Sequence, residues 1–189
     1  MEAWMWIVVA VVVLVLAVIA LVAWVMMTRR RTEGLRRQFG PEYDVALTEA
    51  ESRRSAEAEL EARRERRERL TLRALTPETR DRYAQQWRDV QARFVDSPAV
   101  ALQSADLLVT ELMRERGYPT GDFDQRAADV SVDHPEVVRN YRMAHTVSQE
   151  ATNDAADTER MRQGLMHYRA LFDELLEEDT VDTDREAAG

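Results

Sequence analysis

The hydrophobic and polar positions divide this chain into one long apolar run and a series of shorter amphipathic segments. The run covers residues 3–27, which contain no charge, no proline and no glycine. A bilayer core about 30 Å thick is crossed by roughly 20 helical residues, so the run is long enough to span it. A lone segment in lipid must also satisfy its own backbone hydrogen bonds, which requires a helix. We therefore expect residues 1–27 to form a transmembrane anchor.

Tryptophans lie near both ends of this run. Trp4 and Trp6 stand near its start and Trp24 stands near its end. On a helix, the segment from Trp6 to Trp24 would extend roughly 27 Å. Because indole rings prefer the boundary between lipid and water, we expect these three side chains at the two membrane interfaces.

A cleaved signal peptide is the alternative interpretation of the same run. Such a peptide has a basic start, a shorter apolar stretch and a cleavage site flanked by small residues. Here Glu2 is the only charged side chain before the run, and the nearest processing site, at Ala20, lies inside it. The pattern favours a retained anchor, and cleavage followed by secretion is the minority interpretation.

Arginines directly after the run predict its orientation. No basic side chain precedes the run, and a basic cluster follows it: Arg29, Arg30, Arg31, Arg36 and Arg37. Short Arg-rich flanks stay on the cytoplasmic side. We therefore expect a single-pass protein of the plasma membrane with its N-terminus outside and its C-terminal domain in the cytoplasm. Setting this topology is the simpler role of the arginines, and binding anionic lipid headgroups is the alternative.

Two charged segments are expected after the anchor. Residues 28–41 form a basic juxtamembrane hinge in this interpretation, because Gly34 and the Gly40–Pro41 pair are helix breakers. Residues 42–75 predict a long charged stalk helix, ending near Leu70, and a connector. Glutamate–arginine pairs four residues apart favour this helix. Its apolar positions sustain no heptad repeat, so we expect a solvated stalk or a weak helical dimer.

Residues 76–178 have the pattern of a small antiparallel helical bundle. Prolines at 77, 98 and 135 follow residues suited to helix starts, Gly117 ends one helix, and further helices should begin near Asp122 and Thr158. The apolar spacing predicts four or five short helices. The expected bundle core consists of Tyr83, Trp87, Val90, Phe94, Leu108, Leu112, Tyr141, Met161, Leu165, Tyr168, Phe172 and Leu175.

Outside the anchor, no segment alternates hydrophobic and polar residues with the period of two that is typical of strands. The predicted fold class is therefore all-α, with a single N-terminal transmembrane helix, a long charged stalk helix and a small antiparallel helical bundle. The last segment, residues 179–189, is acidic and is expected to be disordered.

The net charge of −9 over 189 residues is unevenly distributed. Residues 28–75 hold 13 arginines and 10 acidic residues, whereas residues 76–189 hold 13 arginines and 24 acidic residues. An acidic distal part argues against nucleic-acid binding. The basic part suits a position beside anionic lipid, from which the distal domain would be repelled. The chain has no cysteine, which excludes disulfides, thiolate metal sites and a cysteine nucleophile.

The sequence shows no catalytic, cofactor-binding or metal-binding constellation. His134, His145 and His167 lack the four-residue spacing of a helical zinc site, and no glutamate lies three residues before any of them. We expect His145 to be buried and hydrogen-bonded to a backbone carbonyl. Acidic residues cluster between Glu111 and Asp133. In an acidic protein, such clusters arise at helix ends without any catalytic role. We therefore expect no enzyme activity, no cofactor and no metal.

Five short stretches together carry a resemblance to a known family. They are residues 36–44 (RRQFGPEYD), 87–96 (WRDVQARFVD), 116–119 (RGYP), 129–135 (DVSVDHP) and 168–172 (YRALF). They resemble a family of uncharacterised, membrane-anchored proteins of actinobacteria, over nearly the whole chain. That family has no assigned activity, so the resemblance implies an anchored all-α protein and no catalytic or binding residue.

Three functional hypotheses follow from this architecture. The first is a single-pass, membrane-anchored scaffold or adaptor without catalytic activity, which presents its bundle to a protein partner. The alternative is a membrane sensor that binds a lipid or a small ligand. A hydrolase or metalloenzyme using His134 or His145 is the least favoured. Homo-oligomerisation through the anchor or the stalk stays open.

Overall fold

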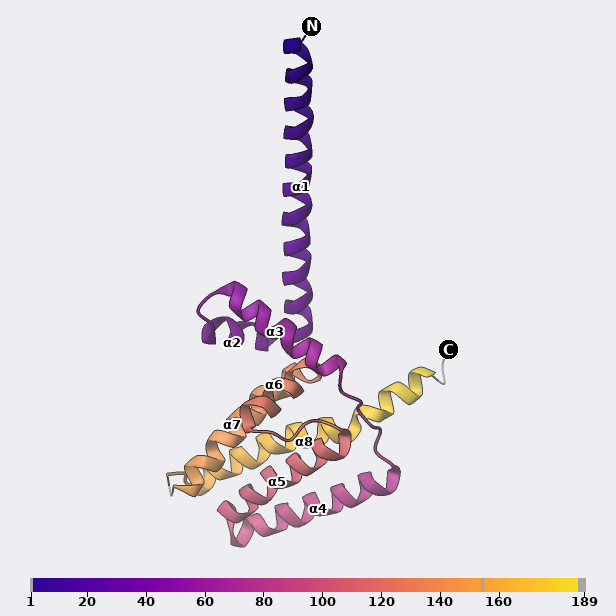
Figure 1. Ribbon diagram of the computed structural model, residues 1–189. Helices are drawn as coiled ribbons and strands as arrows, with labels where there is room; N and C mark the ends of the chain where they lie inside the picture. The colour runs from indigo at the N-terminus through magenta and orange to yellow at the C-terminus, as the bar shows by residue number, and fades with distance from the viewer. Residues whose placement is uncertain (1, 154, 187–189) are drawn as a thin grey trace.

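The protein is almost entirely helical (Figure 1). The computed structural model describes residues 2–153 and 155–186, which form eight α-helices and no strand. This confirms the all-α fold class. The helices are α1 (Glu2–Phe39), α2 (Pro41–Glu49), α3 (Arg53–Glu68), α4 (Pro77–Asp96), α5 (Pro98–Arg116), α6 (Phe123–Asp133), α7 (Pro135–Thr152) and α8 (Thr158–Glu186).

Helix α1 rises away from the rest of the molecule (Figure 1). Its segment Val13–Phe39 is long and apolar enough to cross a membrane. The large apolar side chains from Val13 to Met27 that the structure describes are mostly exposed and pack on no protein core. Such a helix is compatible with a membrane anchor, because lipid would cover the apolar surface that the protein leaves open.

Most of the segment expected to be a hinge, residues 28–41, continues α1 as a helix. Gly34 lies inside this helix, since one glycine in a helix costs only about 1 kcal/mol relative to alanine. The helix ends at Phe39, and Gly40 turns the chain with a φ of +45°. Pro41 then begins α2. The prediction of a break at Gly34 was therefore wrong, and the Gly40–Pro41 pair alone interrupts the helix.

The segment 42–70, expected to be one stalk helix, instead forms two helices, α2 and α3, which fold back on each other. Between α2 and α3, Ala50 is extended, and the Ser52 hydroxyl accepts a hydrogen bond from the backbone N–H of Ser55. This bond satisfies a donor at the start of α3, so a new helix begins there without glycine or proline. The prediction of one long solvated stalk was wrong. We call residues 41–68 the α2–α3 hairpin.

The α2–α3 hairpin packs against the end of α1 and against the bundle. A small apolar core, which we call the hairpin core, joins these elements. Its residues come from α1, α2, α3 and α6: Leu35, Phe39, Tyr43, Ala46, Ala56, Leu60 and Val132. Burying a large apolar side chain stabilises a fold by about 1.5–3 kcal/mol. The C-terminal end of α1 is therefore packed against the hairpin and the bundle, and is not connected to them only by a flexible linker.

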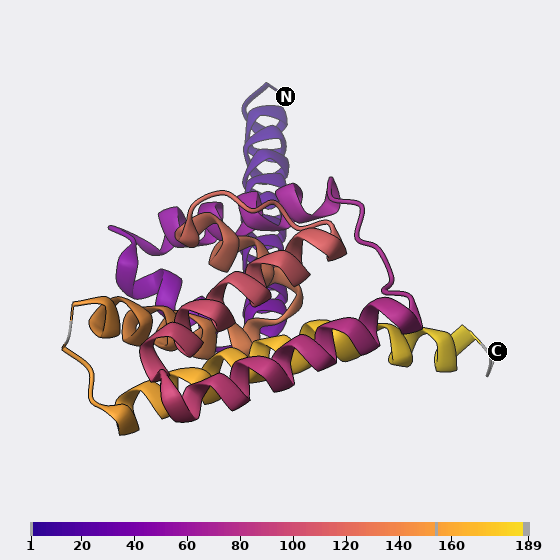
Figure 2. The ribbon, with the colours of Figure 1, turned by 90° about the horizontal axis from the view of Figure 1, so that it is seen from below.

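Helices α4 to α8 form the bundle, and they begin at or beside the predicted positions. Proline starts α4, α5 and α7, where its missing N–H costs no hydrogen bond. Gly117 ends α5 in a left-handed conformation, with a φ of +95°. The five helices spread across the end of α1 that is opposite the N-terminus (Figures 1 and 2).

The expected core residues lie inside the bundle. Ten of the twelve are buried, and Phe94 and Met161 are partly buried at its edge. Trp87 stacks on Phe172 with ring centroids 4.7 Å apart. Further residues of α5 and α7 contribute to this core: Ala101, Leu102, Ala105, Val109, Met113, Val138, Ala144 and Val147.

Helix α8 continues beyond the expected end of the bundle. It runs to Glu186 and projects past the other helices (Figure 1). Residues 179–186 of the segment expected to be disordered lie in this helix, and residues 187–189 lie outside the described residues. No glycine or proline follows Gly164 before the last residue. Extending an existing helix fixes few further dihedrals per hydrogen bond, so nothing local ends it earlier.

Candidate functional site

The three tryptophans predicted at membrane interfaces are exposed along α1. Trp4, Trp6 and Trp24 expose 74%, 69% and 64% of their surface, respectively. None contributes to either apolar core of the described residues. Their positions near the two ends of the apolar run suit rings that sit between lipid and water.

The five arginines after the apolar run are all exposed on α1. Arg29, Arg30 and Arg31 form no ion pair with any described residue. Arg36 lies 3.6 Å from Asp44, and Arg37 lies 3.9 Å from Glu33. Both pairs are solvent-exposed, and such pairs contribute at most about 1 kcal/mol. The first three arginines therefore keep their charge available to another molecule.

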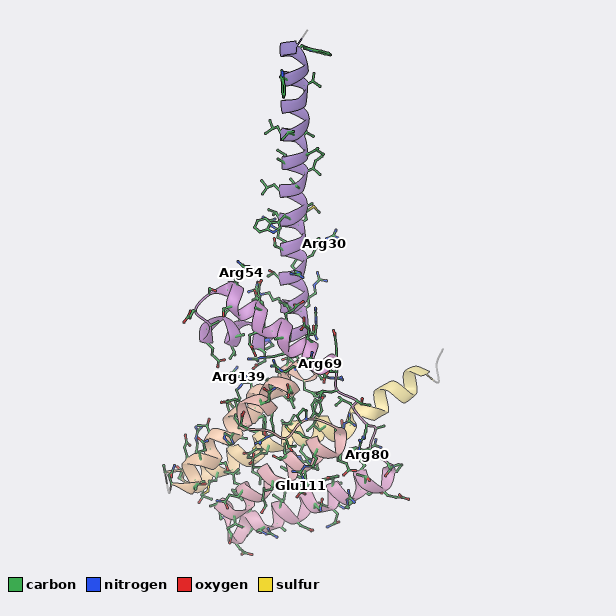
Figure 3. All side chains as sticks on the ribbon, viewed as in Figure 1. Arg30, Arg54, Arg69, Arg80, Glu111 and Arg139 are labelled. Carbon is green, nitrogen blue, oxygen red and sulfur yellow. The ribbon has the colours of Figure 1, made fainter. Side chains whose placement is uncertain are left out.

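A groove lies where the apolar part of α1 ends and α3 packs beside it. It has a volume of about 530 Å³, and we call it the arginine–methionine groove. It combines apolar side chains with three guanidinium groups and one carboxylate. Its lining residues are Ala23, Met26, Met27, Arg30, Arg31, Gly34, Glu61 and Arg64. Figure 3 shows Arg30 on α1 and Arg54 on α3, both on the side of the bundle that faces the N-terminus.

A second groove, of about 470 Å³, also lies between α1 and α3 and includes Arg29, Arg36 and Arg53. Glu57 organises it, because its Oε1 accepts hydrogen bonds from Thr32 Oγ1 at 2.9 Å, Tyr43 Oη at 2.8 Å and Arg53 Nε at 2.9 Å. Burial alone would raise the pKa of Glu57, but these hydrogen bonds hold the pKa below its ordinary value. Donors of the chain itself therefore already occupy Oε1 of this carboxylate.

Three further arginines of α3 join this helix to α2 and to the bundle. Arg63 Nη1 lies 3.9 Å from the buried carboxylate of Glu42, and Arg66 Nε lies 3.7 Å from that of Asp129. Arg67 pairs with Asp133, which also accepts a hydrogen bond from Tyr118 Oη at 2.7 Å. We call these three pairs the arginine latch: Arg63 with Glu42, Arg66 with Asp129, and Arg67 with Asp133. Of the three, the contact between Arg67 and Asp133 is a charge-assisted hydrogen bond, which orients α3 strongly relative to α6.

The histidines do not form a site together. His134 Nδ1 lies 3.3 Å from Glu174 Oε1, and His145 stacks on Phe123 with ring centroids 3.7 Å apart. His145 Nδ1 has no hydrogen-bond partner among the described residues, so the expected bond to a backbone carbonyl is absent there. Burial lowers the pKa of His145 and of His167. The described residues contain no group of three or more side chains placed to hold a metal ion.

The acidic cluster between Glu111 and Asp133 separates into two sets. Asp129 and Asp133 belong to the arginine latch. Glu111, Glu115, Asp122 and Asp124 are exposed.

The contribution of α3 to both grooves was not predicted from the sequence. Arg53 and Arg64 come next to α1 only because the hairpin folds back. Two features of the sequence could have indicated that a separate helix starts near residue 53. Ser52 is suited to cap the start of a helix, and Ala56 and Leu60 are apolar residues four positions apart.

Comparison of the chain with models of protein families, with characterised proteins and with solved structures finds no match. Its function is therefore inferred from its residues and their geometry.

Proposed function

We propose that this chain is a single-pass membrane protein that holds its helical bundle, as a non-enzymatic scaffold or adaptor, against the cytoplasmic face of the plasma membrane. The observation that carries this proposal is the continuity of α1, which passes from its apolar part into the hairpin core without a break. The twelve residues from Thr28 to Phe39 extend roughly 18 Å along the helix. The bundle is thereby held at a short, fixed distance from the end of the apolar run.

A flexible tether would serve a different purpose. A disordered linker lets a domain sample a large volume, and its mean reach grows with the square root of its length. Here the hairpin core packs the end of α1 against the hairpin and α6, and two pairs of the arginine latch join α3 of the hairpin to α6 of the bundle. Such a connection fixes the orientation of the bundle surface as well as its distance, which suits a protein that positions a partner.

The orientation in this proposal rests on the exposed arginines. Arg29, Arg30 and Arg31 follow the apolar run, and no basic side chain precedes it. Basic residues that flank a span are retained on the cytoplasmic side. The bundle therefore faces the cytoplasm, and its partner is a cytoplasmic protein or the cytoplasmic part of a membrane protein.

Single cysteines test the topology, because the natural chain has none. We expect Glu2→Cys to react with a membrane-impermeant maleimide in intact cells. We expect Gln103→Cys, on the exposed side of α5, to react only after permeabilisation. The reverse pattern would invert the topology, and a mature chain that lacks the apolar run would show a cleaved signal peptide instead.

Proximity labelling tests the adaptor role. The full chain is compared with an anchor-only chain and with a variant in which a flexible Gly-Ser linker of equal length replaces residues 40–69. We expect the full chain to label a set of proteins that the anchor-only chain does not label. The linker variant should label these proteins less strongly. A set of labelled proteins identical to that of the anchor-only chain would contradict the proposal.

A further inference from the structure

The arginine–methionine groove has an apolar end and a basic end. Ala23, Met26 and Met27 belong to the last turns of the apolar run, and Arg30 and Arg31 lie one turn further along α1. This turn corresponds to roughly 5–6 Å along the helix. The headgroup layer on each side of a bilayer is about 5–8 Å thick. If Met27 marks the edge of the hydrocarbon, the two guanidinium groups reach the depth of the lipid phosphates.

The charged groups of this groove favour an anion. Three guanidinium groups line it, and its one carboxylate, on Glu61, is already paired with Arg64 Nη2 at 2.5 Å. Arg30 and Arg31 have no ion pair among the described residues. Guanidinium groups present several N–H donors in a plane and bind phosphate oxygens well.

Two further observations describe the groove: part of its wall borders empty space, and one of its arginines has an unsatisfied donor. A Cβ atom added at Gly34 would meet nothing within 4 Å, so this part of the groove wall is empty space. Arg64 Nε is buried and has no hydrogen-bond acceptor among the described residues, although the Glu68 carboxylate lies 3.8 Å away. An unsatisfied buried donor costs free energy until an acceptor reaches it. The volume of the groove lies within the range of about 300–1,000 Å³ that is typical of ligand sites.

We propose that this groove binds the headgroup phosphate of an anionic phospholipid, with the acyl chains lying along Ala23, Met26 and Met27. A soluble phosphate compound shares the chemistry of the basic end, but it would leave the apolar end without a partner. The inference rests on the proposed membrane anchoring, since only an inserted α1 brings the groove to the lipid phosphates. It adds a specific lipid ligand to the adaptor role.

The test uses the full chain in detergent micelles and in nanodiscs. Native mass spectrometry measures its affinity for phosphatidylglycerol and for phosphatidylcholine, and glycerol 3-phosphate serves as the soluble phosphate probe. The double variant Arg30→Gln with Arg31→Gln removes two charges from the groove. The matched control, Arg37→Gln with Arg54→Gln, removes two exposed charges that do not line it.

Each arginine near a membrane surface contributes about fivefold to binding an anionic lipid, so the groove variant should bind phosphatidylglycerol about 25-fold more weakly. The control pair should weaken it less than fivefold. Gly34→Leu fills the groove without changing its charge and should weaken binding at least about tenfold, since a bulky side chain excludes the headgroup. Far-UV circular dichroism should show unchanged helicity in all variants.

Several outcomes would overturn the inference. Equal losses in the two arginine pairs would indicate diffuse attraction to the surface, and an undiminished affinity of Gly34→Leu would exclude the groove as the site. Competition by glycerol 3-phosphate as strong as that by phosphatidylglycerol would identify a soluble phosphate ligand instead. A chain that inserts into nanodiscs but shows no preference for the anionic lipid would remove this inference and leave the proposed anchoring intact. A chain that does not insert would remove both.

Discussion

At the residue scale, Glu42 joins three helices through one buried carboxylate. It lies in the first turn of α2, where its charge also suits the helix dipole, and its side chain is 2% exposed. Arg142 of α7 donates to its Oε1, and Arg63 of α3 lies near its Oε2. Taking a charge out of water is costly unless partners surround it, so the two guanidinium groups and the carboxylate depend on one another.

Replacing Glu42 with alanine should strongly destabilise the connection between hairpin and bundle. The variant would leave Arg63 and Arg142 close together without their shared carboxylate, and breaking a buried pair in this way typically costs about 3–5 kcal/mol. Thermal unfolding of the full chain in micelles, followed by circular dichroism, measures the change. Asp44→Ala is the matched control, since its pair with Arg36 is exposed. Similar losses in both variants would contradict the central role of Glu42.

Two glycines within helices should respond to alanine with opposite sign. A Cβ at Gly164 in α8 would lie 2.8 Å from Val147 Cγ1 and 3.2 Å from Leu102 Cδ1, whereas a Cβ at Gly34 in α1 meets nothing. We expect Gly164→Ala to destabilise by about 1–3 kcal/mol through overpacking. We expect Gly34→Ala to stabilise by up to about 1 kcal/mol through helix propensity.

The same thermal unfolding measurement checks this pair of substitutions. Val147→Ala should partly rescue Gly164→Ala, because it removes the methyl group that the new Cβ meets. A Gly164→Ala variant as stable as the natural chain would show that α7 and α8 can separate slightly at this point.

At the element scale, the helices of the bundle were predictable and the hairpin was not. Prolines at the first position of α4, α5 and α7 act within one turn, so the sequence alone places these starts. The break between α2 and α3 depends on the Ser52 hydroxyl and on burial of Ala56 and Leu60 against other helices. A Glu- and Arg-rich segment without glycine or proline predicts one continuous helix locally, and tertiary packing overrides that preference.

The hairpin core should depend on Leu60. This side chain is fully buried, and truncating a buried leucine to alanine costs about 2–5 kcal/mol. We expect Leu60→Ala to release α3 from α1, so that trypsin cleaves after the arginines of α3 at least about tenfold faster in the micelle-bound full chain. Leu107→Ala is the control, because Leu107 is 64% exposed on the bundle. Unchanged cleavage within α3 would mean that the arginine latch alone holds the hairpin.

At the scale of the whole molecule, two cores of unequal size lie between the apolar run and the C-terminus. The bundle core holds many large side chains, whereas the hairpin core consists of seven residues supported by ion pairs. Regions with few buried apolar contacts open more readily than the centre of a large core. The two grooves beside the expected membrane are therefore lined partly by α3, which belongs to the less stable hairpin.

Hydrogen exchange of the full chain in nanodiscs should show this difference. We expect backbone amides of α2 and α3 to exchange at least about tenfold faster than those in the middle of α5, α7 and α8, read by mass spectrometry of peptides. Anionic lipid should slow the exchange of α3 relative to zwitterionic lipid if the groove is occupied. Uniform exchange over hairpin and bundle would indicate a single cooperative unit.

The sequence by itself determined the features that follow from local chemistry. These are the apolar helix with its exposed tryptophans and arginines, the all-α fold, the starts of the bundle helices and most of the aromatic core. Periodicity, proline and charge act over one or two turns, and they need no knowledge of distant residues.

Only the tertiary structure decided how the anchor meets the bundle. The fold-back of the α2–α3 hairpin, the latch and the groove all bring together residues that lie far apart in the sequence, such as Met26 with Arg64 or Glu42 with Arg142. These contacts form because buried apolar surface and paired charges stabilise one arrangement of helices over others. That preference arises between elements, so no single segment of the sequence displays it.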